Sequence, residues 1–585
     1  MHDLVIANGI VVDGTGAERR RADIGIKDGK IAEIGEIGKN AAEEVIDADG
    51  RIVSPGFVDL HTHYDAQLFW DPTASPSPFH GVTTVLGGFC GFGLAPLNPD
   101  ATDYLVRMLS QVEDIPLSAL HAGVPCDWTQ FSEFAGRLRG NTAVNAGFSI
   151  GHSAVRRVVM GERAVGEQAT PEETARMQDL VRSALAQGAL GFSTSHSVSH
   201  NDHHGAPVPS RYATIDEFKA LAAVCGEFEG SSLEIQPGLD YDEEACEIVT
   251  SMSVAAQRTL NWNLIAVPDL SDKTKARIDR QLAMSDYARE RGGEVVALTL
   301  PTGVGLHMDL YRGGVFDIIT GWDKLFRMSR EERLAALRDP SLRAELVTKG
   351  RTPDSAGEML LNPEVLAVEQ GMSPESAQFN GKTIAEIGRL TGKDPYDAMF
   401  DLALGDGLKT LFTCLNRDED REAYEFRVKL WRDDRTVIGG SDAGAHVETI
   451  DSFAYFTQMI AQAVRRYGVI ELEECIQMLT QGPARLMGLR KRGELRSGWH
   501  ADITIFDEAT IARGPIHMLH DFPTGASRLY AEAEGIDRVI VGGVPIVERG
   551  RWTGAHPGTL LERGRDTRTV GVGRRAVESE LAYAE

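Results

Sequence analysis

Between residues 55 and 480 the chain alternates short apolar runs with amphipathic stretches, and this alternation limits the fold more than any other feature. Apolar runs of strand length separated by segments of helix length predict parallel βαβ units. Eight such runs match a (β/α)8 barrel, an α/β fold, in a chain of this length. The predicted strands are Gly56–His61, Thr83–Gly88, Ala146–Gly151, Ala189–Ser193, Ser232–Gln236, Leu260–Ala266, Glu294–Leu300 and Thr436–Gly440.

The two ends of the chain differ from this middle part. The first fifty residues contain alternating runs such as LVIANGIVV and EVIDADGRIV, separated by Asn-Gly and Asp-Gly pairs. Such pairs favour tight hairpins. The pattern returns near the other end, in ADITIF and DRVIVGGVPIVERG. We expect a small β-sandwich domain built from both termini, and two separate β units are the alternative.

The chain is predicted to divide into a sandwich, a barrel, an insertion and an arm. Residues 1–54 and 482–550 form the two parts of the sandwich, and residues 55–481 form the barrel. An insertion at about 301–395 follows the seventh strand, at the end of the barrel where substrates bind. Residues 551–585, rich in glycine and arginine, are predicted to form an extended C-terminal arm that docks on a neighbouring subunit of a homo-oligomer.

Charge and cysteine usage narrow the class of protein. The net charge is −26, from 60 basic and 86 acidic residues spread along the chain, which argues against nucleic acid or an anionic membrane as a partner. The N-terminus lacks the basic segment of a signal peptide, and no apolar run reaches the length of a transmembrane helix. The six cysteines show no CxxC pair, so a disulfide framework is not expected. A cytoplasmic location fits these features.

The sharpest chemical motif is PGFVDLHTHYD, at residues 55–65, where an apolar strand leads directly into His61 and His63. Alternate residues of a strand point to the same side, so both imidazoles face one place at the carboxyl end of the first barrel strand. Barrels carry their active sites at that end. Two neutral imidazoles so placed form half of a metal site. An accidental pair of histidines on a surface loop is the alternative.

A second motif, VIGGSDAGAH, brings Asp442 to the end of the last predicted strand. In a closed barrel the last strand lies beside the first, so this carboxylate can bind the same metal and accept a proton from an activated water. Capping of the next helix is the alternative role for Asp442. A third motif, GGFCGFGLAP, places Cys90 after the second strand. Cys90 is either a thiolate ligand or a small buried apolar residue.

Together these motifs resemble the amidohydrolase superfamily and, within it, the D-aminoacylase branch of N-acyl-D-amino-acid deacylases. The similarity extends over nearly the whole length and includes GVTTVLGGFCGFGLAP, GHSAVR, GALGFSTS, GGSDAGAH and LTQGPARLMGLRKRGELRSGWHADITIFD. The resemblance implies a divalent cation, zinc, held as one or two ions by the HxH pair, the cysteine and histidines from strands five and six. It also implies that the last-strand aspartate is the general base. His61, His63, Cys90 and Asp442 occupy the matching positions.

The chain departs from this family pattern on strands five and six. Strand five carries Glu234 and Gln236 where the resemblance implies a histidine, and strand six carries Asn261 and Asn263. A site with one ion is one consequence, with Cys90, Glu234 or water completing the ligand set. A weakly held metal that prefers oxygen ligands is the alternative.

Further polar residues follow the predicted strands and are candidates for contacts with substrate. An arginine, for example, can grip a carboxylate with two parallel hydrogen bonds. For His196 and the other histidines after strand four, the alternative is a solvated polar loop. For Arg156, after strand three, it is a surface charge, and for His446, after strand eight, it is a supporting role. The candidates are His152, Arg156, His196, Arg211, Tyr212 and His446.

The predicted function is hydrolysis of a C–N amide bond other than a peptide bond, most simply the deacylation of an N-acyl amino acid or a related small-molecule amide. A bound cation would activate water, and Asp442 would accept its proton. Hydrolysis of a cyclic or aryl amide is the alternative, and Met308, Tyr311, Trp322 and Phe326 fit either an apolar substrate pocket or ordinary packing. A metal-poor protein that binds small molecules without catalysis is an alternative of another class.

Overall fold

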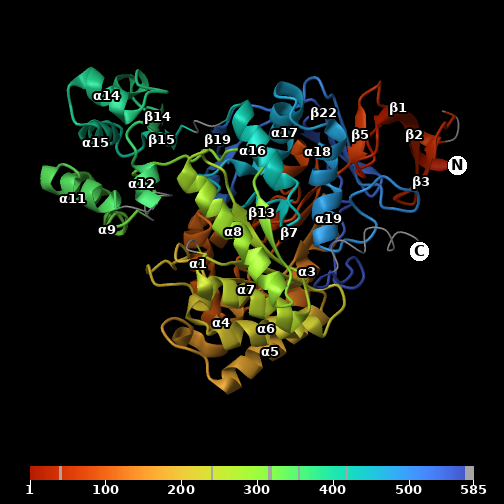
Figure 1. Cartoon of the computed structure of the whole chain (residues 1–585), viewed down its shortest axis with the longest axis horizontal. Helices are drawn as coiled ribbons and strands as arrows, with labels where there is room; N and C mark the ends of the chain where they lie inside the picture. Colours follow the sequence, from red (N-terminus) through yellow and green to blue (C-terminus); the bar gives the residue numbers. More distant parts are fainter. Residues whose placement is uncertain are drawn as a thin grey trace. The chain divides into compact units, whose positions relative to one another are not determined.

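The computed structural model describes residues 1–38, 42–238, 241–313, 316, 319–352, 356–415 and 419–573. The chain divides into two compact units, which Figure 1 shows in the colours of the sequence. The first unit comprises Met1–Thr302, Arg421–Ala445 and Ser452–Glu585. The second comprises Gly303–Asp420 and His446–Asp451.

Two sheets of parallel strands form the centre of the first unit. One has the order β6-β7-β8, and the other has the order β16-β13-β12-β11-β10-β9. Every residue of β7 and β10 is buried, as is typical of parallel strands covered on both faces. The strands are β6 (Phe57–Asp59), β7 (Val82–Gly87), β8 (Asn145–Phe148), β9 (Ile150–Gly151), β10 (Gly191–Ser195), β11 (Ser232–Gln236), β12 (Leu260–Ile265), β13 (Val295–Thr299) and β16 (Thr436–Ile438).

Hydrogen bonds connect the ends of these two sheets. Only Ser149 separates β8 from β9, and the N–H of Leu190, just before β10, donates to the carbonyl of Phe148 at 2.8 Å. At the other end, Thr62 pairs with Ala443 in a parallel bridge between the segments after β6 and β16. All eight predicted strands are confirmed, because each overlaps an observed strand and the third is divided into β8 and β9.

Helices follow most of these strands, and polar caps define where they begin. The hydroxyl of Thr170 accepts a hydrogen bond from the N–H of Glu173 at 3.2 Å, and Pro171 opens α5. Among the described residues, no helix has both the length and the apolar character needed to cross a bilayer. The helices of this unit are α1 (Pro99–Val112), α2 (Leu117–Gly123), α3 (Phe131–Leu138), α4 (His152–Met160), α5 (Pro171–Ala186), α6 (Ile215–Gly226), α7 (Glu243–Ala256), α8 (Asp272–Glu290), α16 (Arg421–Trp431), α17 (Tyr455–Met459), α18 (Leu472–Leu479) and α19 (Gln481–Leu486).

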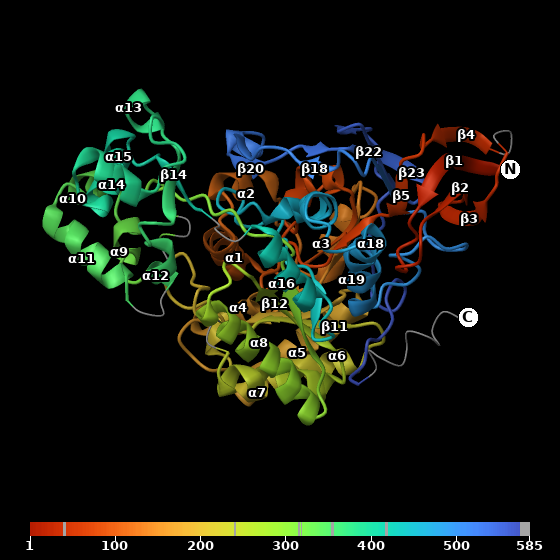
Figure 2. The ribbon, with the colours of Figure 1, turned by 45° about the horizontal axis from the view of Figure 1, so that its top comes forward.

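Strands from both termini join one nine-stranded sheet, so the prediction of a single β module built from both ends is confirmed. The sheet has the order β24-β23-β22-β17-β5-β1-β2-β3, with β4 also paired to β1, and Figure 2 shows red N-terminal strands beside blue C-terminal ones. Ile6, Ile24, Ile503 and Ile540 belong to the apolar cluster that it buries. Its strands are β1 (His2–Val11), β2 (Arg20–Lys27), β3 (Lys30–Gly35), β4 (Ala42–Asp47), β5 (Ile52–Pro55), β17 (Ile503–Phe506), β22 (Ile536–Val541), β23 (Val544–Glu548) and β24 (Arg551–Trp552). Two short antiparallel pairs complete the C-terminal region: β18 (Ala512–Arg513) with β21 (Ala533–Glu534), and β19 (His517–Leu519) with β20 (Arg528–Tyr530).

The described part of the predicted C-terminal arm is extended, but it lies on its own chain. The N–H of Ala146 in β8 donates to the carbonyl of Thr559 at 3.0 Å, and the N–H of Thr259, just before β12, donates to the carbonyl of Val570 at 2.9 Å. These hydrogen bonds hold the described part of the arm on its own chain, and its docking on a neighbouring subunit stays a prediction. Residues 574–585 lie outside the described residues, and homo-oligomer formation stays a prediction.

The second unit contains the predicted insertion, and it extends beyond the predicted boundary at 395 to Asp420. The segment His446–Asp451 also belongs to it, because the N–H of His307 donates to the carbonyl of Thr449 at 2.7 Å. The elements are α9 (Asp323–Phe326), α10 (Arg330–Ala336), α11 (Pro340–Gly350), α12 (Ala356–Leu360), β14 (Leu366–Gln370), α13 (Pro374–Ala377), α14 (Ile384–Thr391), α15 (Pro395–Gly405) and β15 (Leu411–Cys414), with β14 and β15 antiparallel.

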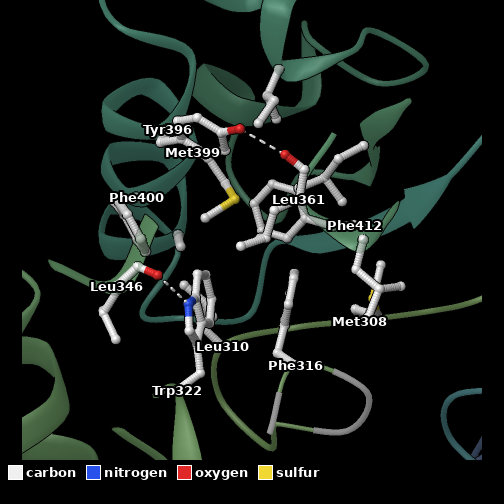
Figure 3. Packing of buried hydrophobic residues seen from close by; sticks show 14 of the residues in the cluster. Met308, Leu310, Phe316, Trp322, Leu346, Leu361, Tyr396, Met399, Phe400 and Phe412 are labelled. Carbon is white, nitrogen blue, oxygen red and sulfur yellow. Dashed lines mark hydrogen bonds between the residues drawn. The ribbon is translucent and has the colours of Figure 1, made fainter. Parts of the chain in front are cut away.

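An apolar core of its own holds the second unit together (Figure 3). Trp322 is fully buried, stacks on Phe316 with ring centroids 5.4 Å apart, and donates its indole N–H to the carbonyl of Leu346 at 2.9 Å. Met308 is also fully buried in this cluster. Trp322 and Met308 therefore have the packing role that the sequence left open for them, since the core encloses both side chains.

A buried histidine of the second unit gives a pH-dependent contribution to stability. His307 Nδ1 lies 2.6 Å from Glu369 Oε2, and Nε2 lies 3.9 Å from Asp451 Oδ2. Burial alone would lower the pKa of His307, but the two carboxylates outweigh it and raise the pKa from 6.5 to about 9. A pKa raised by folding stabilises the fold fully below pH 6.5 and loses that effect as the pH rises through 9.

We therefore expect Glu369→Gln to destabilise the protein by about 1.5–3 kcal/mol below pH 6.5, the usual loss for a hydrogen bond to a charged group. The difference from wild type should shrink above pH 9, where His307 is neutral in both proteins. Thermal unfolding midpoints measured from pH 6 to 10 test this. A difference in midpoint between wild type and Glu369→Gln that stays constant over that range would contradict the raised pKa of His307.

Candidate functional site

His61 and His63 follow β6 and are both buried, with 0% and 4% of their surfaces exposed. Their alternate positions place both rings on one side of the chain, with centroids 5.3 Å apart. The backbone is fixed there by two hydrogen bonds: Thr62 N–H donates to Leu86 O at 2.9 Å, and His63 N–H donates to Ala443 O at 2.8 Å. The pair is thus part of the edge where strands β6, β7 and β16 end.

Cys90 follows β7 and brings its sulfur to His61. The Sγ atom lies 3.6 Å from His61 Nε2, and one donor atom each from Cys90, His61 and His63 lie within 4.8 Å of one another. Cys90 has a φ of 54°, which is a left-handed backbone conformation that residues other than glycine adopt rarely. Gly88, two residues earlier, also has positive φ, and a Cβ there would meet Ser149 O at 2.3 Å. The local backbone is therefore shaped to aim this thiol inward.

Asp442 completes the cluster from the segment after β16. Its Oδ1 atom lies 3.2 Å from His61 Nε2 and 3.7 Å from His63 Nε2. Asp442 also has a left-handed backbone, with φ at 50°. The amide of Asn263 on β12 donates to Oδ1 at 3.2 Å, and because a carboxylate only accepts, the nitrogen of that amide faces Asp442. Beside it, Ser441 donates its hydroxyl proton to the buried Asp59 at 2.7 Å.

Glu234 occupies the middle of β11 and is 1% exposed. Its Oε2 atom accepts a hydrogen bond from the N–H of Cys90 at 2.8 Å. Its Oε1 atom lies 3.9 Å from His61 Nδ1, the ring nitrogen opposite to the one that faces Asp442. Glu234 is thus brought to the cluster, but the contacts it makes are with the outer side of His61 and with the backbone of Cys90.

A second buried carboxylate, Glu113, was not singled out in the sequence. It follows the last residue of α1, is 2% exposed, and places Oε1 3.2 Å from His63 Nδ1. The sequence carries no motif at this position, since one glutamate after an amphipathic helix is ordinary. Only the packing of α1 against the strands brings it to the histidine pair.

The charges of the cluster shift the pKa values of its members in different directions. Burial alone would lower the pKa of His63, but Glu113 and Asp442 outweigh it and raise the pKa to about 9. Burial alone would raise the pKa of Asp442, but the hydrogen bonds and charges of His61 and His63 hold it well below its usual value. Burial raises the pKa of the Cys90 thiol and of the Glu234 carboxyl well above their usual values.

The donor atoms of this cluster fit a divalent cation. Two imidazole nitrogens, a thiol sulfur and a carboxylate oxygen are the ligand types that zinc selects. Asn263 Oδ1 is a buried polar atom beside Asp442 that has no hydrogen-bond partner among the described residues, and a bound group would satisfy it.

His152 and Arg156 lie in a separate buried network. His152 Nδ1 is 2.8 Å from Thr194 Oγ1, and its Nε2 is 2.9 Å from Glu217 Oε1. Arg156 forms an ion pair with the same carboxylate, and both residues are 0% exposed. Arg156 is therefore not a surface charge, because Glu217 holds it inside the unit. Contact of these two side chains with substrate stays a prediction.

Arg211 and His196 both belong to the region around the loop after β10. Arg211, in a short 3-10 helix, donates to Val198 O, His200 O and Asn201 Oδ1 at 2.8–3.3 Å, so its guanidinium already holds this loop. His196 is half-buried directly after β10.

Tyr212 is half-buried at the end of the same 3-10 helix. His446 is half-buried, has a left-handed backbone with φ at 46°, and begins the short return segment of the second unit.

The fold and the cluster together define an α/β enzyme whose reactive side chains stand at the carboxyl ends of parallel strands. The chain belongs to the amidohydrolase family, whose model matches residues 44–547. The predicted resemblance is thereby confirmed, and the chain is a hydrolase of C–N bonds other than peptide bonds. Residues 1–55 also match the model of the N-terminal domain of the urease alpha-subunit.

Characterised relatives resemble the chain over nearly its whole length. A D-aminoacylase of Alcaligenes xylosoxydans xylosoxydans is 28% identical over 96% of this chain and 98% of its own length. An N-acyl-D-glutamate deacylase of the same organism is 26% identical, with 96% of each chain covered. A solved structure of a D-aminoacylase, described as having a binuclear metal centre with one-metal activation and second-metal attenuation, matches at a TM-score of 0.64 and 25% identity. It covers 96% of this chain and all of that one.

Proposed function

We propose that this protein is a metal-dependent deacylase that hydrolyses the amide bond of N-acyl amino acids, with the D configuration as the preferred one. The observation that carries the proposal is the convergence of His61, His63, Cys90 and Asp442 around one point at the strand ends. The names of the relatives, a D-aminoacylase and an N-acyl-D-glutamate deacylase, support the substrate class and its configuration.

We further propose that the parallel strands close into a (β/α)8 barrel and that the terminal sheet folds into a β-sandwich. The hydrogen bonds that join β8/β9 to β10 and the Thr62–Ala443 bridge support closure of the barrel. The apolar cluster between the N- and C-terminal strands supports the sandwich. On this basis the cluster lies at the end of the barrel where such enzymes bind substrate.

His61, His63, Cys90 and Asp442 would hold one zinc ion. When bound, a divalent cation supplies Lewis acidity, which polarises a carbonyl group and acidifies a water molecule. Asp442 accepts the proton of the attacking water and delivers it to the leaving nitrogen, so that an acid and an amine are released. The Asn263 amide keeps the Asp442 carboxylate oriented for both transfers.

The function is tested with purified, zinc-loaded protein and a panel of amides. The panel contains N-acetyl derivatives of D- and L-leucine, methionine, glutamate and aspartate, together with a cyclic imide and an aryl amide. We expect release of free amino acid, faster from D than from L derivatives. Turnover of only the cyclic or aryl amides would replace the proposed substrate class, and no bound metal with no turnover would favour a binding protein instead.

The proposed role of Cys90 as a ligand has a spectroscopic test. A thiolate bound to Co²⁺ gives a charge-transfer band, and only the deprotonated sulfur binds the ion. We expect this band in the cobalt-loaded wild type and its loss in Cys90→Ser, while the matched Cys225→Ser variant, altered at a buried cysteine on α6, retains it. An unchanged band in Cys90→Ser would remove Cys90 from the ligand set.

A further inference from the structure

Each imidazole of the histidine pair has two chemically different sides in this structure. The Nε2 atoms of His61 and His63 face Asp442 Oδ1, at 3.2 and 3.7 Å. The Nδ1 atoms face buried carboxylates that come from other elements: Glu234 for His61 and Glu113 for His63. The same arrangement is thus built twice, from α1 in one case and from β11 in the other.

Glu113 is held firmly in its position behind His63. Its backbone N–H donates to the carbonyl of Leu109 at 2.9 Å, so it continues the last turn of α1. The start of that helix is capped by Asn98, whose side chain accepts from the N–H of Ala101 at 2.8 Å. A carboxylate that is 3% exposed is costly to bury unless it interacts with charged or polar groups. The 3.2 Å approach to His63 Nδ1 gives it such an interaction.

Glu234 contacts two members of the cluster at once. Oε2 is engaged by the N–H of Cys90 at 2.8 Å, which ties the strained loop after β7 to β11. Among the described residues, Oε1 has no hydrogen-bond partner, and it lies 3.9 Å from His61 Nδ1, which has none there either. A buried donor and acceptor are both costly when unpaired, so a hydrogen bond between these two atoms is the pairing that would satisfy both of them.

A histidine binds a cation through one nitrogen, and a carboxylate that accepts the proton of the other nitrogen fixes which one is free. It also restricts rotation of the ring and increases the basicity of the binding nitrogen. We propose that Glu113 and Glu234 are positioning residues, which hold His63 and His61 by Nδ1 so that both Nε2 atoms point at one divalent cation. This rests on the proposed function, since it presupposes the cation, and it assigns Glu234 a place behind the ligands rather than among them.

The test measures zinc affinity of the full-length, metal-stripped protein by competition with a chelator of known affinity. The variants are Glu113→Gln, Glu113→Leu and Glu234→Gln. Glu369→Gln is the matched control, because it alters a carboxylate that also faces a histidine Nδ1 but lies in the second unit. Thermal unfolding of the stripped proteins reports whether each variant is folded.

We expect Glu113→Leu to weaken zinc binding by about 10- to 100-fold, the usual effect of losing such a partner. Glu113→Gln should lose less, because an amide oxygen still accepts from Nδ1. Glu234→Gln should also weaken binding, and the control should match wild type. If Glu113→Leu does not fold, the zinc affinities of Glu113→Gln and Glu234→Gln decide whether the positioning role holds.

The two proposals fail in different ways. Wild-type protein that binds no zinc contradicts the proposed function itself. Wild-type protein that binds zinc tightly, with folded Glu113 and Glu234 variants of unchanged affinity, contradicts only the positioning role. A fall in affinity as large in Glu369→Gln as in the other variants also contradicts it, since the effect would then not depend on these two carboxylates.

Discussion

Asp442→Asn is expected to reduce kcat/KM for N-acyl amino acids by on the order of 10³-fold or more. General-base transfer alone contributes about 10²- to 10⁴-fold, and an asparagine cannot accept the proton. The substitution is nearly isosteric, so the backbone with φ at 50° is preserved, because asparagine tolerates that conformation well. The loss should appear mainly in kcat, since the residue acts on the reacting water.

Two measurements make this result specific to Asp442. The zinc content of Asp442→Asn is measured beside its kinetics, so that loss of the cation is separated from loss of the base. The control is Asp286→Asn, which removes a half-exposed carboxylate of α8 that pairs with Arg435. This variant should retain wild-type kinetics. Activity of zinc-loaded Asp442→Asn within tenfold of wild type would exclude Asp442 as the base.

The double variant His61→Ala, His63→Ala is expected to bind no zinc and to show no turnover. Removal of zinc from the wild type with a chelator should have the same effect on activity, and added zinc, manganese or cobalt should restore it only in the wild type. Zinc should also raise the free energy of unfolding of the wild type, because a ligand that binds only the folded state stabilises it by about 2.7 kcal/mol at a hundredfold excess over its Kd.

Zinc titrations followed by thermal unfolding separate these outcomes. The unfolding midpoint of the wild type should rise with zinc concentration, and the midpoint of the double variant should not. An equal rise in both proteins would place the bound zinc elsewhere in the chain. Full activity of the wild type after exhaustive removal of metal would contradict a metal-dependent reaction.

The position of the site could be predicted because it depends on strand ends. His61, Cys90 and Asp442 each follow an apolar run, and the carboxyl ends of parallel strands share one edge. Runs of this kind are visible in the sequence, so Asp442 could be expected to meet His61, His63 and Cys90 although hundreds of residues separate it from them. The structure brings them within hydrogen-bond or ion-pair distances.

Contacts that depend on packing between distant elements could not be predicted in this way. Glu113 reaches His63 because α1 packs in one particular orientation, and no local pattern records that orientation. Arg156 follows a strand, as residues of the site do. Whether its side chain contacts solvent, substrate or a buried partner depends on Glu217, which is 61 residues further along the chain. The C-terminal arm could be recognised as extended, while its docking place on its own chain required the structure.

The second unit is entered by the chain twice, and this limits how it can be exchanged between enzymes. Its long segment, Gly303–Asp420, pairs with the short one, His446–Asp451, through a bridge between Leu306 and Ile450. Gly305 N–H donates to an Asp451 carboxylate oxygen at 2.6 Å, which strengthens that pairing. A chimaera that takes only the long segment from a relative would leave the short one without its native neighbours, so both segments have to be transplanted together.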